Sequence, residues 1–296
     1  MKGDPRRRRR IALAVAILLA PALCAWTASW RIPVWAAHGM LHPPHRTPPP
    51  ETELAHEDLV LESEGARLVG WRFHAEGERR GLVVYLHGLC DDRREAVGLA
   101  RKYTPRGFDV VAYDSRAHGQ SGGDACTYGA LERVDLARIL DRERAGPVAL
   151  IGGSLGGAVA LEAAAEDPRI SLVVAIAPFS DLHTLEIERA PWYATASELE
   201  DAFRIGAREC GLRLDAGSPV SAARRIRCPV LLVHGTADTD TPPSHSQRIL
   251  AALSGRKRLI LEPGLGHHDP LGTPTWEAID EAVLAIAGGA GADRPH

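Results

Sequence analysis

The sequence predicts an α/β fold: a doubly wound, mostly parallel eight-stranded sheet with a short helical cap, preceded by an N-terminal transmembrane helix. Short apolar runs alternate with helical segments from residue 82 onward, as expected for parallel strands that are buried on both faces. Two strands of antiparallel type come before them. A basic cluster and an uncharged stretch open the chain, which is typical of a membrane anchor.

Length and composition agree with one large domain. The chain has 296 residues, of which 45% are apolar and 25% are charged, the ordinary usage of a globular protein. Residues 1–37 hold seven of the 35 basic residues and one of the 38 acidic residues, which leaves 28 basic against 37 acidic. No basic stripe then remains to neutralise phosphates, so the sequence argues against a nucleic-acid partner.

The N-terminal segment decides the expected location. Residues 1–10 carry five adjacent arginines, and residues 11–30 are uncharged and long enough for one membrane span. The positive-inside rule places the arginines in the cytoplasm and the rest of the chain in the periplasm or at the cell surface. A cleaved signal sequence, which would give a secreted protein, is the alternative, but Cys24-Ala25-Trp26 is a poor cleavage site.

The folded domain is expected over residues 56–290, after a proline-rich extended spacer at 31–55. The interval 179–227 is too long for a connecting loop and predicts the cap. An antiparallel pair is expected at 58–62 and 67–73. The predicted parallel strands are 82–86, 109–113, 148–151, 172–176, 230–233 and 258–261, with helices near 91–104, 128–144, 155–166, 243–254 and 274–287.

One stretch carries the clearest chemical signal. The apolar run 148–151 is followed by Gly152-Gly153-Ser154-Leu155-Gly156 and then by an alanine-rich helical segment. Glycines two residues on either side of a serine let a strand and a helix approach closely, while the hydroxyl projects from the sharp turn between them. Ser154 is therefore the candidate nucleophile.

Other reactive side chains follow other predicted strands. His87-Gly88-Leu89-Cys90 follows the strand at 82–86, His234 to Asp238 follow 230–233, and Gly264 to His268 follow 258–261. Doubly wound sheets place their ligands beyond the carboxyl ends of the strands, where these groups would meet. An acyl-transfer site needs a nucleophile, a base, a carboxylate and amide donors, and all four are present.

These motifs resemble those of the α/β-hydrolase superfamily, in particular serine hydrolases of the esterase and lipase type. The resemblance covers residues 56–290 and includes His87-Gly88, Asp114-Ser-Arg-Ala-His-Gly-Gln-Ser121 and Gly235-Thr-Ala-Asp-Thr-Asp-Thr-Pro242. It implies a triad in the order Ser154, Asp238, His267. It further implies an oxyanion hole made by the backbone N–H groups of Leu89 and Leu155.

Two neighbours compete with these assignments. Asp240 stands two residues from Asp238, and His268 adjoins His267. Asp238 occupies the position of the acid in the resembling proteins, and the histidine preceded by glycine matches their usual base. We therefore expect Asp240 to cap a turn and His268 to point elsewhere.

Several other polar groups are expected to be structural. Asp114, Arg116 and His118 are interpreted as a turn after a strand, His234 as a packed histidine at a strand end and His245 as a surface residue. The resembling proteins often have glycine where this chain has Ala117. No Cys-x-x-Cys or His-Glu-x-x-His pattern is present, so neither a metal site nor a cofactor is predicted.

The predicted function is a serine hydrolase that cleaves carboxylic esters or thioesters of a small-molecule acyl substrate through an acyl-enzyme. An aminopeptidase or amide hydrolase is the alternative, and it needs a carboxylate pair in the cap, for which Glu186, Glu188, Glu198, Glu200 and Asp201 are available. A catalytically inactive binding module is the non-enzyme alternative, but the motifs are intact. Dehalogenase chemistry is disfavoured because Ser154 stands where that chemistry uses aspartate.

A disulfide between Cys90 and Cys126 is a further hypothesis. The third and fourth strands of the resembling fold are neighbours, about 4.8 Å apart, and the two cysteines follow them. The oxidising compartment inferred from the anchor permits the bond. Cys210 and Cys228 are alternative partners.

Overall fold

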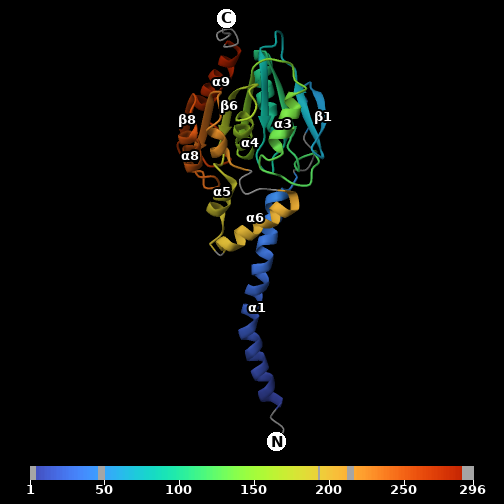
Figure 1. Cartoon of the computed structure of the whole chain (residues 1–296), viewed down its shortest axis with the longest axis vertical. Helices are drawn as coiled ribbons and strands as arrows, with labels where there is room; N and C mark the ends of the chain where they lie inside the picture. The colour runs from blue at the N-terminus through green and yellow to red at the C-terminus, as the bar shows by residue number, and fades with distance from the viewer. Residues whose placement is uncertain (1–4, 46–50, 193, 212–216, 289–296) are drawn as a thin grey trace.

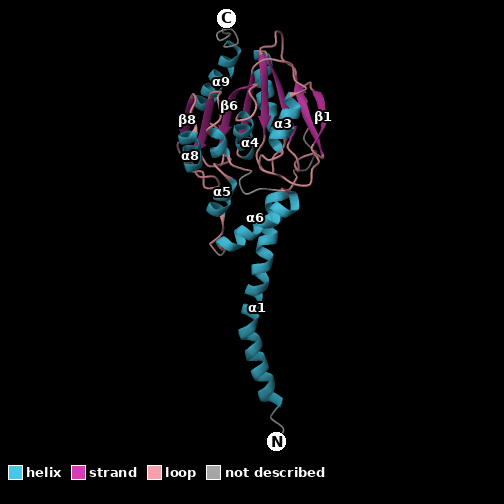
Figure 2. Cartoon of the chain, in the orientation of Figure 1, coloured by secondary structure: helices cyan, strands magenta, loops and turns pink. Residues whose placement is uncertain are grey.

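A computed structural model describes residues 5–45, 51–192, 194–211 and 217–288. Parts of the predicted segments, residues 1–4, 46–50 and 289–290 among them, lie outside this range. Within it, an eight-stranded sheet runs in the order β1-β2-β4-β3-β5-β6-β7-β8, with helices on both faces (Figures 1 and 2). The predicted eight-stranded α/β sheet is confirmed.

The strands match the predicted apolar runs and extend them by a residue or two. Their bounds are β1 Glu57–Ser63, β2 Ala66–Phe73, β3 Gly81–Leu86, β4 Phe108–Asp114, β5 Val148–Gly153, β6 Ile170–Ile176, β7 Val230–Gly235 and β8 Lys257–Glu262. β1 and β2 form the predicted antiparallel pair, and β2 also runs antiparallel to β4. All other pairs are parallel, so the carboxyl ends of β3 to β8 meet along one edge.

Alternate residues of the strands bury two separate apolar layers. Leu82 and Val84 of β3 pack on one face with the helices α3, α4 and α8, while Val83 packs on the other face with α2 and α9. Continuous burial on both faces is what makes these strands read as uninterrupted apolar runs. The helices of the body are α2 Val97–Tyr103, α3 Glu132–Leu140, α4 Leu155–Ala164, α8 Ser244–Ala252 and α9 Thr273–Gly288.

The described part of the segment between β6 and β7 contains three helices. They are α5 Leu182–Arg189, α6 Ala196–Cys210 and α7 Pro219–Ala223. Asp181 caps α5 by accepting from Thr184 N, and Thr195 with Glu198 forms a capping box at the start of α6. These caps fix where each short helix begins. We refer to α5 and α6 together as the cap.

The N-terminal helix α1 spans Pro5–Leu41 and projects away from the sheet (Figure 1). Residues 31–41, which the sequence analysis placed in the spacer, form its last turns, since the closely spaced prolines begin only at Pro43. These turns pack on α6 and bury Ala37, Met40 and Leu41.

The predicted transmembrane helix is wrong, and with it the membrane anchoring and the extracytoplasmic location drawn from that helix. Among the described residues, no helix has the combination of length and apolar character that crossing a bilayer requires. The chain of α1 begins with five arginines, and Pro21, Thr27 and Arg31 break the apolar sequence that follows.

The predicted disulfide is also wrong. Cys90 and Cys126 are both described, and each is a thiol. Adjacent strands do not bring the two sulfur atoms together, because Cys126 turns inward and its backbone N–H donates to Leu41 O (2.8 Å), whereas Cys90 stays half-exposed. Burial raises the pKa of the Cys126 thiol well above its ordinary value.

Candidate active site

Ser154 occupies a sharp corner between β5 and α4. Its backbone has φ 47° and ψ −113°, a conformation that a residue with a side chain rarely adopts. Two backbone hydrogen bonds stabilise the corner: Ser154 N donates to Ile176 O of β6 (2.8 Å), and Ala158 N of α4 donates to Ser154 O (3.0 Å). The strained backbone is thus over-determined by its neighbours, as at many functional sites.

The glycines around Ser154 are required by close backbone contacts. A Cβ atom on Gly152 would lie 2.4 Å from Gly156 C, and a Cβ atom on Gly156 would lie 2.0 Å from Leu86 O. No side chain fits at either position. The glycines therefore let α4 start directly above β5 and bring the turn after β3 against the serine.

That turn contains the predicted oxyanion-hole residue Leu89. Its neighbour Gly88 lies so close to the corner that a Cβ atom on Gly88 would be 3.7 Å from Ser154 Cβ. Leu155, the second predicted donor, is the first residue of α4, so its N–H has no hydrogen-bond partner within the helix. Both residues line the same pocket as Ser154.

Asp238 and His267 meet beside this corner. His267 Nδ1 donates to Asp238 Oδ2 at 2.7 Å. In a neutral ring this bond leaves Nε2 as the nitrogen that can accept a proton. The loops that carry the two residues are joined, since Ala237 N donates to Leu265 O (3.0 Å) and Thr236 N to Glu262 O (2.9 Å).

Asp238 is held by several donors besides His267. Its Oδ1 accepts from Thr241 N (2.8 Å) and Asp240 N (3.0 Å). His234 Nε2 lies 3.3 Å from Oδ2. Burial alone would raise the pKa of Asp238, but the bonds from His234, His267 and Thr241 outweigh burial and hold the pKa well below its usual range. The carboxylate is therefore ionised at neutral pH and accepts from His267.

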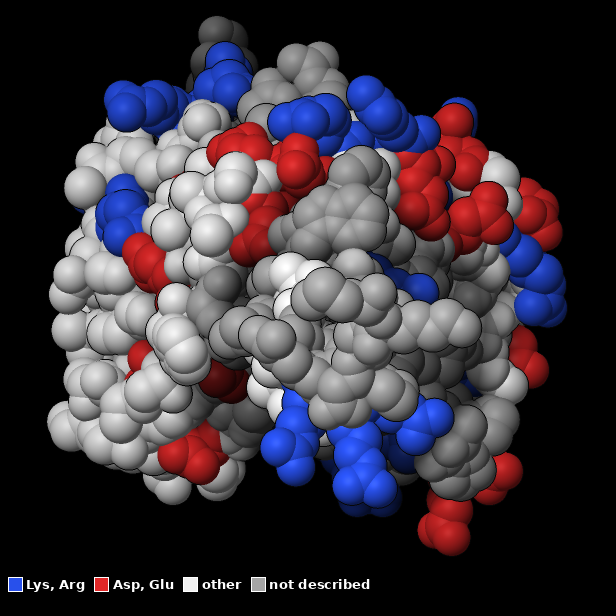
Figure 3. Space-filling view, turned by 90° about the horizontal axis from the view of Figure 1, so that it is seen from below, with Lys and Arg blue, Asp and Glu red and all other residues white. Residues whose placement is uncertain are grey.

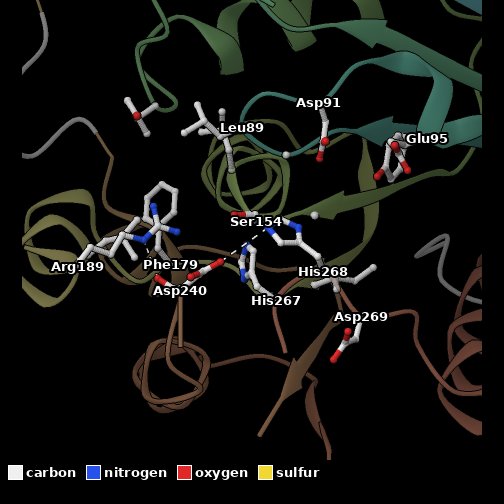
Figure 4. A pocket seen from close by; sticks show the side chains of 18 residues that line it. Leu89, Asp91, Glu95, Ser154, Phe179, Arg189, Asp240, His267, His268 and Asp269 are labelled. Carbon is white, nitrogen blue, oxygen red and sulfur yellow. Dashed lines mark hydrogen bonds and ion pairs between the residues drawn. The ribbon is translucent and has the colours of Figure 1, made fainter. Parts of the chain in front are cut away.

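A pocket of about 350 Å³ is lined by both Ser154 and His267. Figure 4 shows Ser154 at its centre, with His267 and His268 on one side and Leu89 opposite. Phe179 and Arg189 close one end, and Asp91 and Glu95 stand at the other. The pocket can hold a small substrate, with apolar walls from Leu89, Tyr128, Ile176, Phe179 and Leu185.

The two competing neighbours lie at the mouth of the pocket. His268 is 82% exposed, and its Nε2 is 3.8 Å from Asp240 Oδ2. The rings of His267 and His268 stand perpendicular, with centroids 5.0 Å apart. Only His267 is bonded to the buried carboxylate, so the geometry favours His267 over His268 as the base.

The Asp114 cluster is structural, as predicted. Asp114 is fully buried and accepts from Arg93 N (2.9 Å), Gln120 N (2.7 Å) and the Arg93 guanidinium, while Arg116 makes two 2.8 Å bonds to Asp135. Ala117 has φ 56°, so the turn does use a left-handed residue at this position. Burial, followed by the nearby His87, lowers the pKa of His118 to about 4.

Three side chains have an environment or a contact that the sequence did not predict. His245, expected at the surface, is fully buried, and its Nδ1 accepts from Ser180 N (3.0 Å). His234 is packed as expected, but it also contacts the carboxylate of Asp238. Arg189 of α5 donates from Nε to Asp240 O (2.6 Å) and from Nη2 to Thr241 Oγ1 (3.3 Å). Arg189 and His245 lie far from their partners in the sequence, while His234 and Asp238 are only four residues apart but meet through an irregular loop, so none of these contacts leaves a periodic signal.

Metal ligation finds no support among the residues that the structure describes, since they contain no group of three or more His, Cys, Asp or Glu side chains arranged to hold an ion.

The sheet topology together with the corner at Ser154 defines the class of protein: the chain is an α/β-hydrolase, as its motifs predicted. The model of the family described as serine aminopeptidase, S33, matches residues 77–204. An uncharacterised protein of Mycobacterium tuberculosis is 29% identical over 242 residues, which cover 79% of this chain and 78% of that protein.

Solved structures agree on the fold. An esterase of Pyrococcus furiosus superposes with a TM-score of 0.61 at 22% identity and covers 83% of this chain and 96% of its own. Acetyl xylan esterase 1 of a Thermoanaerobacterium species superposes with a TM-score of 0.63 at 21% identity and covers 88% and 93%. Taken together, the comparisons support a hydrolase.

Proposed function

We propose that this protein is a serine hydrolase that cleaves carboxylic esters or thioesters of small acyl substrates. Ser154 is the nucleophile, His267 the general base and Asp238 the residue that orients His267. The observation that carries the proposal is the 2.7 Å bond from His267 to the buried Asp238, in a pocket shared with the strained Ser154.

The reaction runs in two steps on this geometry. Ser154 Oγ attacks the acyl carbon while His267 Nε2 takes its proton, and the N–H groups of Leu89 and Leu155 donate to the oxyanion. The bond to the leaving group breaks, and His267 returns the proton to the departing oxygen or sulfur. Water then attacks the acyl-enzyme, again with His267 as base, and releases the acid and free Ser154.

Ester cleavage is favoured over aminopeptidase activity by where the cap carboxylates lie. Glu188 is paired with Arg248 and Asp201 with Arg204, while Glu198 is bonded within its capping box and Glu200 to His183. None of these, nor Glu186, borders the pocket, to which the cap contributes Leu185 and Arg189. The carboxylate pair that would hold a substrate amine is therefore not supplied by the cap.

The test compares wild type with Ser154→Ala on p-nitrophenyl esters of increasing chain length, with aminoacyl p-nitroanilides as the amide arm. We expect ester hydrolysis by wild type and a loss on the order of 10⁴-fold or more in kcat for Ser154→Ala. A fluorophosphonate probe should label wild type and not the variant. Ser171→Ala, at the far end of β6, is the matched control and should keep full activity. Labelling of Ser154→Ala, or faster amide than ester cleavage, would contradict the proposal.

A further inference from the structure

The carboxylate of Asp238 is contacted by two histidines. His267 Nδ1 donates to Oδ2 at 2.7 Å from the loop after β8, and His234 Nε2 stands 3.3 Å from the same oxygen at the end of β7. His234 and the side chain of Asp238 are both fully buried. The second histidine is therefore inside the protein, behind the acid and away from the pocket.

The partners of His234 determine its tautomer. Nε2 lies 2.7 Å from Thr241 O, and because a carbonyl oxygen only accepts, Nε2 carries the proton. Nδ1 lies 2.7 Å from Ser246 Oγ of α8, which then donates to it. The Nε2–H group thus donates to Thr241 O and also stands 3.3 Å from Asp238 Oδ2, so the imidazole of this β7 residue contacts both ends of the short segment 238–241.

We propose that His234 is a positioning residue of the active site, which holds Asp238 so that its Oδ2 faces His267. The two imidazoles share one carboxylate oxygen in opposite tautomers, His267 protonated on Nδ1 and His234 on Nε2. The inference rests on the proposed roles of Asp238 and His267. It adds a residue that touches neither substrate nor nucleophile.

This arrangement affects the base through the acid. A donor on Oδ2 takes up part of the charge of the carboxylate, which leaves less of it to stabilise a protonated His267. The other charged groups around Asp238 are Arg189 of α5, bonded to Asp240 O and Thr241 Oγ1, and the exposed pair Asp240 and His268. None of them is bonded to Oδ2, so His234 is the donor whose removal acts directly on the oxygen that His267 uses.

The test is the pH profile of kcat/KM on a p-nitrophenyl ester, normalised by fluorophosphonate titration to the concentration of active sites. In His234→Leu the acidic midpoint, set by His267, should move upward by about one unit or less, the range of a single hydrogen bond. His234→Gln can donate from its amide and should keep the midpoint near the wild-type value. His118→Leu, a buried histidine that contacts no member of the triad, is the matched control.

A fall in the number of active sites with an unmoved midpoint in His234→Leu would make His234 merely structural and overturn the proposal. So would equal shifts in His234→Leu and His234→Gln. If the leucine variant does not fold, ¹⁵N NMR of histidine in wild type decides: we expect His234 as the Nε2–H tautomer, and an Nδ1–H tautomer overturns the inference. Failure of the proposed function appears separately, as fluorophosphonate labelling that survives Ser154→Ala.

Discussion

Ser154 is fixed by close contacts and hydrogen bonds between backbone atoms, whereas Asp238 and His267 are fixed by hydrogen bonds of their side chains. At the serine corner, Gly152 and Gly156 leave no room for a Cβ atom, and the strand and helix backbones touch. On the acid and base side, donors from β7, α5 and the loop after β8 converge on the segment 238–241. A side chain added at a closed steric contact should disrupt the fold at once, whereas the loss of one hydrogen bond from a network should lower activity only in part.

The two sides also differ in surroundings. Leu155 and the start of α4 are buried, whereas Asp240 and His268 border open solvent at the pocket mouth. Seen from the α1 side, basic and acidic side chains are interspersed on the described surface (Figure 3). Substitutions of Gly152 and Gly156 should therefore act mostly on folding, and those of Asp238 and His267 mostly on rate.

The largest expected effect removes the base. His267→Ala should lower kcat by on the order of 10⁴-fold or more, because Nε2 is the only group proposed to take the proton of Ser154. His268→Ala is the matched control and should lose less than about tenfold, since His268 is exposed and its ion pair with Asp240 lies at the surface. Ester hydrolysis rates of purified variants check this, and a greater loss in His268→Ala would reverse the assignment of the base.

The next prediction addresses the steric side. In Gly156→Ala the new Cβ would lie 2.0 Å from Leu86 O and 2.7 Å from His87 O, both backbone atoms, so β3 and α4 must separate. We expect a loss of several kcal/mol in the free energy of unfolding, about 4 or more, or no folded protein. At Gly153 the nearest atom to a new Cβ is Tyr85 Oη at 4.0 Å, so Gly153→Ala should unfold near the wild-type denaturant midpoint. Equal midpoints for the two variants would show that the corner is not sterically closed.

A smaller effect is expected where the cap meets the acid. Arg189→Ala removes the bonds from α5 to Asp240 O and Thr241 Oγ1. We expect kcat/KM to fall by roughly three- to tenfold, with little change in thermal stability, because one or two exposed bonds are lost. Arg189→Lys cannot reproduce the two bonds and should recover only part of the rate. Unaltered kinetics in Arg189→Ala would show that the contact between α5 and the segment 238–241 does not affect the rate.

The smallest effect concerns stability alone and lies on the helix that follows Ser154. Glu162 is buried, and among the described residues no hydrogen bond reaches its carboxylate oxygens. Burial raises its pKa well above the usual value, so the folded state binds a proton that the unfolded state releases. Stability is therefore greatest below the unfolded pKa and falls as pH rises through the folded pKa.

Glu162→Gln should remove that part of the pH dependence and stabilise the protein at alkaline pH. Denaturant unfolding at pH 5 and pH 9 measures it, with the exposed Glu281→Gln as the control. An unaltered difference between the two pH values in Glu162→Gln would show that Glu162 is ionised in the folded protein.

The sequence predicted the serine side better than the acid and base side, and the same physical difference explains why. A steric corner requires glycine at Gly152 and Gly156, and this requirement is visible in one short motif. The choice of Asp238 over Asp240 and of His267 over His268 came from family resemblance, because hydrogen-bond partners up to 65 residues apart leave no local pattern. For the same reason His245 was misplaced at the surface. The contact from His234 to Asp238 was not foreseen although the two residues are only four apart, because it depends on the conformation of the loop after β7.

The last turn of α1 is bonded to the segment that forms part of the pocket wall. Tyr128 borders the pocket, and its hydroxyl donates to Met40 O (2.9 Å), while Cys126 N donates to Leu41 O in the same last turn of α1. The 37-residue helix α1 thus ends against Tyr128, a residue that lines the pocket. A displacement of the last turn of α1 would therefore break a hydrogen bond of a residue that lines the pocket, although α1 itself lies outside the sheet.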